Sequence, residues 1–281
     1  MRVRGWKDLV LVEAGVRSCA LVAVAEPDLL DLILTLDSKG LKYMFSSQKL
    51  VNRNKVSYGS YAFQRTAIPL ESPEEGDILI YVCKSARELR VAEKAEHSHS
   101  DTLIGELLDY PQCCIVSFSE RFDRYQFDNS ILKMIEPYLE MSEQREYSFV
   151  INIFARFYDQ SILSHYPCRL DCERSIELGF EYLSCLRSAD LRLARRLEYH
   201  ARCELAVSPG VGLWAFRWNR REELNEQSPN VISSVQWGTD QKRDWIFNND
   251  GTFVRSVPGG IILSSKNEEE RFLPGYSFHF G

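Results

Sequence analysis

The first 84 residues carry short runs in which apolar and polar positions alternate, a pattern that predicts strands. Residues 9–13 (LVLVE) and 19–24 (CALVAV) predict two strands around a turn at Gly15. After Pro27, residues 29–38 (LLDLILTLDS) predict a helix that ends near Gly40. Further strands are expected at 42–45, 56–65 and 78–82. Residues 1–84 are therefore predicted to form an N-terminal α/β unit.

From residue 86 to about residue 202, apolar positions recur at helical spacing instead. The longest run, residues 171–203, has apolar side chains on one face and many arginines on the other, which predicts one long amphipathic helix. We therefore expect a helical domain over residues 85–206.

After residues 209–210 (Pro-Gly) the pattern returns to short segments with the period of strands. Turn-forming residues at 249–251 (NDG) and 258–260 (PGG) separate strands that we expect at 245–247, 253–257 and 261–263. Residues 207–281 are predicted to form an antiparallel β meander. The three regions together predict an α+β fold.

Composition narrows the classes of protein to which the chain can belong. An apolar fraction of 44% over 281 residues is enough for a hydrophobic core, and a formal charge of -6 gives no general attraction to nucleic acid or to anionic membranes. The N-terminal residues do not resemble a signal peptide, and no apolar run is long enough to span a membrane. We expect a cytoplasmic protein that binds neither nucleic acid nor membrane.

The sequence contains eight cysteines, and in a reducing compartment we expect free thiols, metal ligands or reactive groups. Cys19 and Cys83 lie in strand-like runs, and Cys185 and Cys203 lie in a helical run. These four are expected to be small buried apolar side chains.

The other cysteines occur in two segments that resemble each other. Cys113 and Cys114 follow Tyr110-Pro111 and fall in the first turn of a predicted helix, where unpaired N–H groups and the helix dipole stabilise thiolates. Cys168 and Cys172 follow another Tyr-Pro step, at the start of the helix predicted from residue 171.

If the two helix starts meet, four sulfurs surround one point. Cys113, Cys114, Cys168 and Cys172 are then the predicted ligands of a zinc ion or of an iron–sulfur cluster, with His165 as an alternative ligand. Adjacent residues on a helix diverge by about 100°, so both Cys113 and Cys114 can face the metal only if the first helical turn is irregular. Metal-free thiol chemistry and plain packing of the four side chains stay open as alternatives.

Residues 78–179 resemble a family of uncharacterised prokaryotic proteins, a domain of unknown function. Its signature is an LGYPxCC motif followed by HxPCxxxC; the residues that match here are Leu108, Tyr110, Pro111, Cys113, Cys114, His165, Pro167, Cys168 and Cys172. Asp109 stands where the motif has glycine. The resemblance implies that the cysteines belong to one site, and it implies no activity.

Other residues support weaker hypotheses. The spacing of Glu96 and His99 is that of a di-iron site, but a second copy on another helix is missing from the sequence, so a solvated helix end is favoured. The arginines of residues 187–202 alternate with carboxylates, which favours a salt-bridged surface over an anion site. Phosphate-loop, dinucleotide-fingerprint and serine-hydrolase motifs are absent from the sequence.

The function predicted from these patterns is an enzyme that acts on a small molecule through a cysteine-bound metal or iron–sulfur centre. His165, Asp171 and Glu173 are its candidate catalytic residues, as an acid, a base or groups that orient the ligands. Two alternatives stay open: a binding or scaffold protein with a structural zinc site, and a metal-free thiol oxidoreductase.

Overall fold

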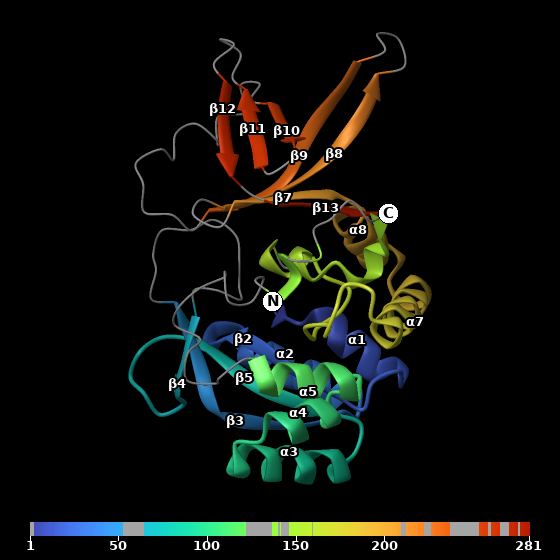
Figure 1. The fold of residues 1–281 in the computed structure, drawn as a ribbon. Helices are drawn as coiled ribbons and strands as arrows, with labels where there is room; N and C mark the ends of the chain where they lie inside the picture. The colour runs from blue at the N-terminus through green and yellow to red at the C-terminus, as the bar shows by residue number, and fades with distance from the viewer. Residues whose placement is uncertain are drawn as a thin grey trace.

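The structure is a computed structural model that describes residues 3–52, 65–121, 137–139, 141, 146–158, 160–208, 212–221, 226–236, 253–257, 260–264, 270–274 and 276–281. The fold is α+β, as predicted. Figure 1 shows the N-terminal sheet at one end of the molecule, the C-terminal strands at the other, and α7 and α8 between them at one side. The predicted strand at 56–65 lies almost wholly outside the described residues, and so do the predicted strand at 245–247 and the turn at 249–251.

Within the described part of the chain, the N-terminal sheet has five strands in the order β1-β2-β5-β3-β4, and every pair is antiparallel. The strands are β1 (Val3–Arg4), β2 (Cys19–Ala25), β3 (Lys42–Asn52), β4 (Arg65–Pro69) and β5 (Asp77–Cys83). Alternate residues of β5 enter two different cores, since a strand points its side chains to both faces of a sheet. Ile80 and Val82 pack against α1 (Trp6–Ala14) and α2 (Leu29–Ser38), whereas Tyr81 packs against α3 (Ala86–Ser98) and α4 (Asp101–Leu107).

The strand predicted at 9–13 is wrong, because these residues belong to helix α1. Gly5 and Gly15 flank the helix, and both adopt left-handed backbone angles (φ 82°) that favour glycine. Within α1, Leu9 and Val12 face the sheet, and Leu11 enters the core around α7. A short apolar run that is buried on more than one side does not show its period, which explains the error.

The central region is helical in part. Besides α3 and α4 it contains α5 (Gln112–Arg121), the 3-10 helices η3 (Phe149–Ile151) and η4 (Ile153–Tyr158), α7 (Glu173–Ala189) and α8 (Leu191–Ala201). The single helix predicted over 171–203 is two helices: Asp190 ends α7, and its carboxylate accepts a hydrogen bond from the N–H of Leu193 to cap α8. Salt bridges from Arg187 and Arg202 to Glu198 fit the predicted charged surface.

The C-terminal region contributes strands to two sheets among the described residues. A three-stranded sheet contains β10 (Phe253–Val257), β11 (Gly260–Ser264) and β12 (Glu270–Pro274). A five-stranded sheet has the order β6-β13-β7-β8-β9, with β6 (Glu146–Tyr147), β7 (Glu204–Ser208), β8 (Gly212–Arg221), β9 (Glu226–Gln236) and β13 (Tyr276–Phe280). The last strand, β13, lies antiparallel to β7 and parallel to β6, so the strands do not form one continuous meander.

A third core joins these regions. Phe154 of η4 contacts Phe278 of β13, with ring centroids 4.8 Å apart, and Tyr182 and Leu186 of α7 are buried in the same cluster. Cys114 and Cys172 also belong to this cluster. The cysteine segments therefore border a packed core to which α1 contributes Leu11.

Candidate metal centre

The two cysteine segments meet. The sulfur atoms of Cys113, Cys114, Cys168 and Cys172 all lie within 4.8 Å of one another. The distances from Cys172 to Cys113 and to Cys114 are 3.7 Å and 3.8 Å, and the sulfurs of Cys113 and Cys114 are 3.9 Å apart. Cys113 is exposed, Cys168 is half-buried, and the other two are buried. The cluster is therefore shielded on one side and accessible from solvent at Cys113.

The first turn of α5 carries both adjacent cysteines of the cluster. The carbonyl of Pro111 accepts hydrogen bonds from the N–H of Cys114 (2.8 Å) and from that of Ile115 (3.0 Å). The first of these bonds spans three residues and the second spans four, so the carbonyl of Pro111 is shared by two N–H groups, as is common at helix termini. In this turn the sulfurs of Cys113 and Cys114 point to the same cluster.

The second segment reaches the cluster as an extended loop. The hydroxyl of Tyr138 donates to the carbonyl of Pro167 (2.6 Å), and the N–H of Cys168 donates to the sulfur of Cys114 (3.3 Å). Cys172 then occupies the N-cap position of α7 with an extended backbone. Its sulfur lies at the end of the helix where N–H groups are unpaired, as the sequence predicts.

A buried polar chain leads from the cluster to His165. The hydroxyl of Ser175 lies 3.2 Å from the sulfur of Cys114 and 2.9 Å from Nε2 of His165. Nδ1 of His165 is buried and has no hydrogen-bond partner among the described residues. Burial lowers the pKa of His165 to about 3, and the charges of Arg17, Arg156 and Lys7 act in the same direction, so this imidazole is neutral at pH 7.

The thiols of the cluster differ in their electrostatic surroundings. Burial raises the pKa of Cys114 far above its usual value, and burial together with the neighbouring thiols raises the pKa of Cys168 to about 12. Burial also opposes ionisation of Cys172, but hydrogen bonds from Ser175 and from neighbouring thiols outweigh it and lower the pKa of Cys172. A bound cation would favour the thiolate form of every member of the cluster.

The distances fit a single tetrahedral metal ion. Zinc bound by four thiolates has Zn–S bonds of about 2.3 Å, so the edges of the tetrahedron are about 3.8 Å long. The three sulfur pairs at 3.7, 3.8 and 3.9 Å match this length. Among the described residues, no other group of His, Cys, Asp and Glu side chains comes together in this way.

The remaining candidate residues are not members of the group formed by the four sulfurs. Asp171 is paired with the exposed side chain of Arg169, and Glu173 is exposed in the first turn of α7. Glu96, half of the weak di-iron hypothesis, accepts hydrogen bonds from Ser46, Ser47 and Tyr81 and so links α3 to β3 and β5.

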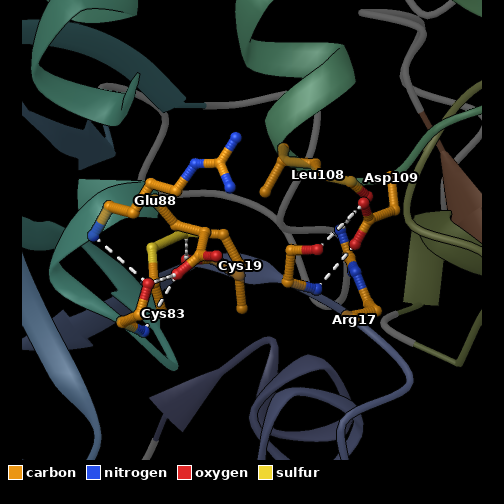
Figure 2. Close-up of a disulfide and its surroundings, with 10 residues drawn as sticks. Arg17, Cys19, Cys83, Glu88, Leu108 and Asp109 are labelled. Atoms are coloured by element: carbon orange, nitrogen blue, oxygen red, sulfur yellow. Dashed lines mark hydrogen bonds between the residues drawn. A yellow bond between two sulfur atoms is a disulfide. The ribbon is translucent and has the colours of Figure 1, made fainter. Parts of the chain in front are cut away.

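Cys19 and Cys83 form a disulfide, so the expectation that they are free, buried thiols is wrong. They are directly opposite each other in β2 and β5, with Cα atoms 4.2 Å apart, and both are fully buried. The register of two strands 64 residues apart brings them together, and local sequence patterns carry no sign of it. Figure 2 shows the disulfide together with Arg17, Leu108 and Asp109. Leu108 and Asp109 directly precede Tyr110 and Pro111 of the first cysteine segment.

Comparisons with known proteins agree with the resemblance seen in the sequence. Residues 83–203 match the model of a family described as "Protein of unknown function (DUF483)". The uncharacterized protein MJ1106 of Methanocaldococcus jannaschii is 40% identical over 80 residues, which are 28% of this chain and 38% of that protein. The aligned part thus spans well under half of the relative. No solved structure matches the chain.

Among the described helices, none combines the length and the apolar character that crossing a membrane requires.

Proposed function

We propose that this chain, whose residues 83–203 match the model of an uncharacterised family, binds one metal ion, by preference zinc, through Cys113, Cys114, Cys168 and Cys172. The ion would link the start of α5 to the start of α7 and so hold together two segments that are far apart in the sequence. The observation that carries the proposal is the set of sulfur–sulfur distances of 3.7–3.9 Å.

The same distances favour a single ion over an iron–sulfur cluster. In a [4Fe–4S] cluster each thiolate binds a different iron, and in a [2Fe–2S] cluster the thiolates bind the two irons in pairs. Irons and bridging sulfides then separate the cysteine sulfurs from one another. Here all four sulfurs lie within 4.8 Å, which leaves room for one ion between them.

A set of four protein ligands favours a structural role. Structural zinc sites are closed by four side chains, whereas catalytic sites keep one position for water or substrate. His165 is in contact with Ser175, and Asp171 is paired with Arg169, so neither is needed to complete the coordination. In this proposal zinc binding stabilises the fold, because the unfolded chain has no preformed site.

A second candidate function, a catalytic metal centre for a small-molecule substrate, has one observation in its favour. Cys113 is exposed, while the other three cysteines are buried or half-buried. If Cys113 left the metal, a coordination position open to solvent would result. His165 would then be the nearest candidate acid or base, acting through Ser175.

The test is metal analysis of the purified protein and of single-cysteine variants. One equivalent of zinc without visible absorption is expected, and Cys168→Ala or Cys172→Ala should lower the zinc content and the melting temperature. Cys185→Ala is the matched control, because Cys185 is a free, half-buried cysteine of the same helix α7. Iron with labile sulfide would contradict the single-ion proposal, and protein that binds no metal would favour thiol chemistry.

Cobalt substitution separates the structural from the catalytic role. Tetrahedral cobalt bound by four thiolates has a characteristic visible spectrum that changes when a ligand is exchanged. If the site is structural, an added small thiol should leave the spectrum of the wild type unchanged. A shift of the spectrum on addition of the thiol, with the fold intact, would show an open position and favour the catalytic alternative.

A further inference from the structure

A buried ion pair lies behind the metal centre. Asp8 of α1 and Arg17, which precedes β2, form a salt bridge, and their side chains are only 7% and 1% exposed. Burial by itself would raise the pKa of Asp8, but Arg17, Lys7 and Ser164 outweigh burial and lower it, so both groups are charged. Buried ion pairs contribute little net stability, yet each partner must remain hydrogen-bonded, so they fix the geometry of what they hold.

Arg17 holds the segment that leads to Cys113 and Cys114. Its Nη2 donates to the carbonyl of Leu108 (2.9 Å), and its guanidinium lies 5.4 Å from the ring centroid of Tyr110. Figure 2 shows Arg17 directed toward Leu108 and Asp109.

Asp8 holds the segment that leads to Cys168 and Cys172. The hydroxyl of Ser164 lies 2.7 Å and 2.9 Å from the two carboxylate oxygens of Asp8. The neighbouring Lys7 donates to the carbonyls of residues 161, 162 and 163 at 2.6–3.1 Å. Helix α1 thus binds the loop over four consecutive residues.

The two segments are also tied to each other at the same place. The hydroxyl of Tyr110 donates to the carbonyl of Ser164 (3.3 Å), and the ring of Tyr110 packs on His165 with centroids 5.0 Å apart. The carbonyl of Ser164 also accepts a hydrogen bond from Arg156 (2.6 Å). The contacts of the ion pair with Leu108, Tyr110 and Ser164 therefore lie three to five residues before the first cysteine of each segment.

We infer that Asp8 and Arg17 are positioning residues for the cysteine cluster: the ion pair in the N-terminal unit sets the distance between the two cysteine segments. This inference rests on the proposed function in so far as the cluster binds metal. Neither residue touches a sulfur. They act through Leu108 and Ser164, as outer groups around a metal site orient the groups that bind it.

The test compares zinc affinity among variants, measured by competition with a coloured chelator. Ser164→Ala removes the hydroxyl that Asp8 binds, and Arg17→Lys keeps the charge but not the planar fork that reaches both Asp8 and Leu108. Each variant is expected to weaken zinc binding about 10-fold or more, within the range known for outer-shell groups. The cobalt spectrum should broaden or shift, which a uniform loss of stability would not cause.

Glu96→Gln is the matched control. Glu96 is a half-buried carboxylate of the N-terminal unit that also cross-links elements, through Ser46, Ser47 and Tyr81. This variant should lower the melting temperature but leave the zinc Kd within about twofold, since it shares no partner with the centre. If Ser164→Ala and Arg17→Lys keep the zinc Kd and the cobalt spectrum of the wild type, the inference is wrong.

If the wild-type protein binds no metal, the proposed function fails, and the positioning role is measured on the thiols themselves. The oxidant diamide accepts two electrons and two protons from Cys113 and Cys172, whose sulfurs are 3.7 Å apart, as they form a disulfide. Peptide mass spectrometry gives the rate. Slower formation in Ser164→Ala and Arg17→Lys than in Glu96→Gln would support the inference, and equal rates in all three would overturn it.

Discussion

The carboxylate of Asp109 accepts hydrogen bonds from the backbone N–H of Ser18 (2.6 Å) and from its hydroxyl (3.1 Å). Asp109 has a left-handed backbone (φ 55°), which is strained for most residues other than glycine. The motif that this segment resembles has glycine at this position. The two bonds to Ser18 therefore offset the strain and hold the turn that precedes Pro111.

Replacing Asp109 should separate these two effects. Asp109→Ala loses both hydrogen bonds and keeps the strain, so we expect a loss of about 2 kcal/mol in the free energy of unfolding. Asp109→Gly loses the bonds but relieves the strain, so its loss should be about 1 kcal/mol smaller. Urea unfolding of the two variants measures the difference, and an alanine variant as stable as the glycine variant would contradict this account.

Reduction of the Cys19–Cys83 disulfide should destabilise the protein. The bond closes a loop with a sequence separation of 64 residues, and the entropy of loop closure gives about 4 kcal/mol. The double variant with Cys19→Ala and Cys83→Ala should therefore be less stable than the wild type and insensitive to phosphine reductants. Alkylation of the unreduced, denatured and metal-free chain should label six of its eight cysteines; eight labelled thiols would show that the disulfide is absent.

Acidification should destabilise the protein through His165. Its pKa is about 3 in the fold and about 6.5 when unfolded, so the unfolded chain binds more protons between these values, and stability falls as the pH drops below 6.5. At pH 5 this contribution reaches roughly 2 kcal/mol.

To isolate the contribution of His165, the wild type is compared with the variant His165→Gln, and both proteins are saturated with zinc. The wild type should lose roughly 2 kcal/mol more than the variant between pH 7 and pH 5, because protonation of other groups cancels in the difference. Equal losses in urea unfolding would show that the imidazole is not held neutral by burial and by the cations around it.

Gly179 should not tolerate a methyl group. A Cβ built at this position of α7 would lie 2.8 Å from Cβ of Val150, which belongs to the short helix η3 and cannot move without its backbone. Alanine normally favours a helix over glycine, yet we expect Gly179→Ala to cost about 1–3 kcal/mol through overpacking. Ser184→Ala, at an exposed position of the same helix, is the control and should be close to neutral by thermal unfolding.

Local signals were enough to predict the cysteine segments and much of the fold. The Tyr110-Pro111 step directly precedes α5, the Tyr166-Pro167 step precedes the loop that leads into α7, and the strands β2 and β5 show clear apolar runs. The sequence also predicted that the four sulfurs would converge if the two helix starts met. Adjacent residues of a helix diverge, yet the sulfurs of Cys113 and Cys114 lie 3.9 Å apart and both belong to the cluster.

Features that depend on distant contacts could not be predicted. Helix α1 is buried on two sides and resembles a strand in its sequence, and the break at Asp190 depends on one capping side chain. The disulfide and the Asp8–Arg17 pair depend on register and topology, for which a single sequence carries no pattern. The domain boundaries, the compartment, the metal-binding and catalytic roles of the site residues and a small-molecule substrate stay predictions.

The position of β13 has a consequence for the order in which the core can form. Its residues Phe278 and Phe280 fill the core against Phe154, and the N–H of Gly281 donates to the carbonyl of Tyr147. Contacts between residues so far apart in the sequence form more slowly than the contacts within a helix. The core that also contains Cys114 and Cys172 is therefore completed after the helices around it have formed.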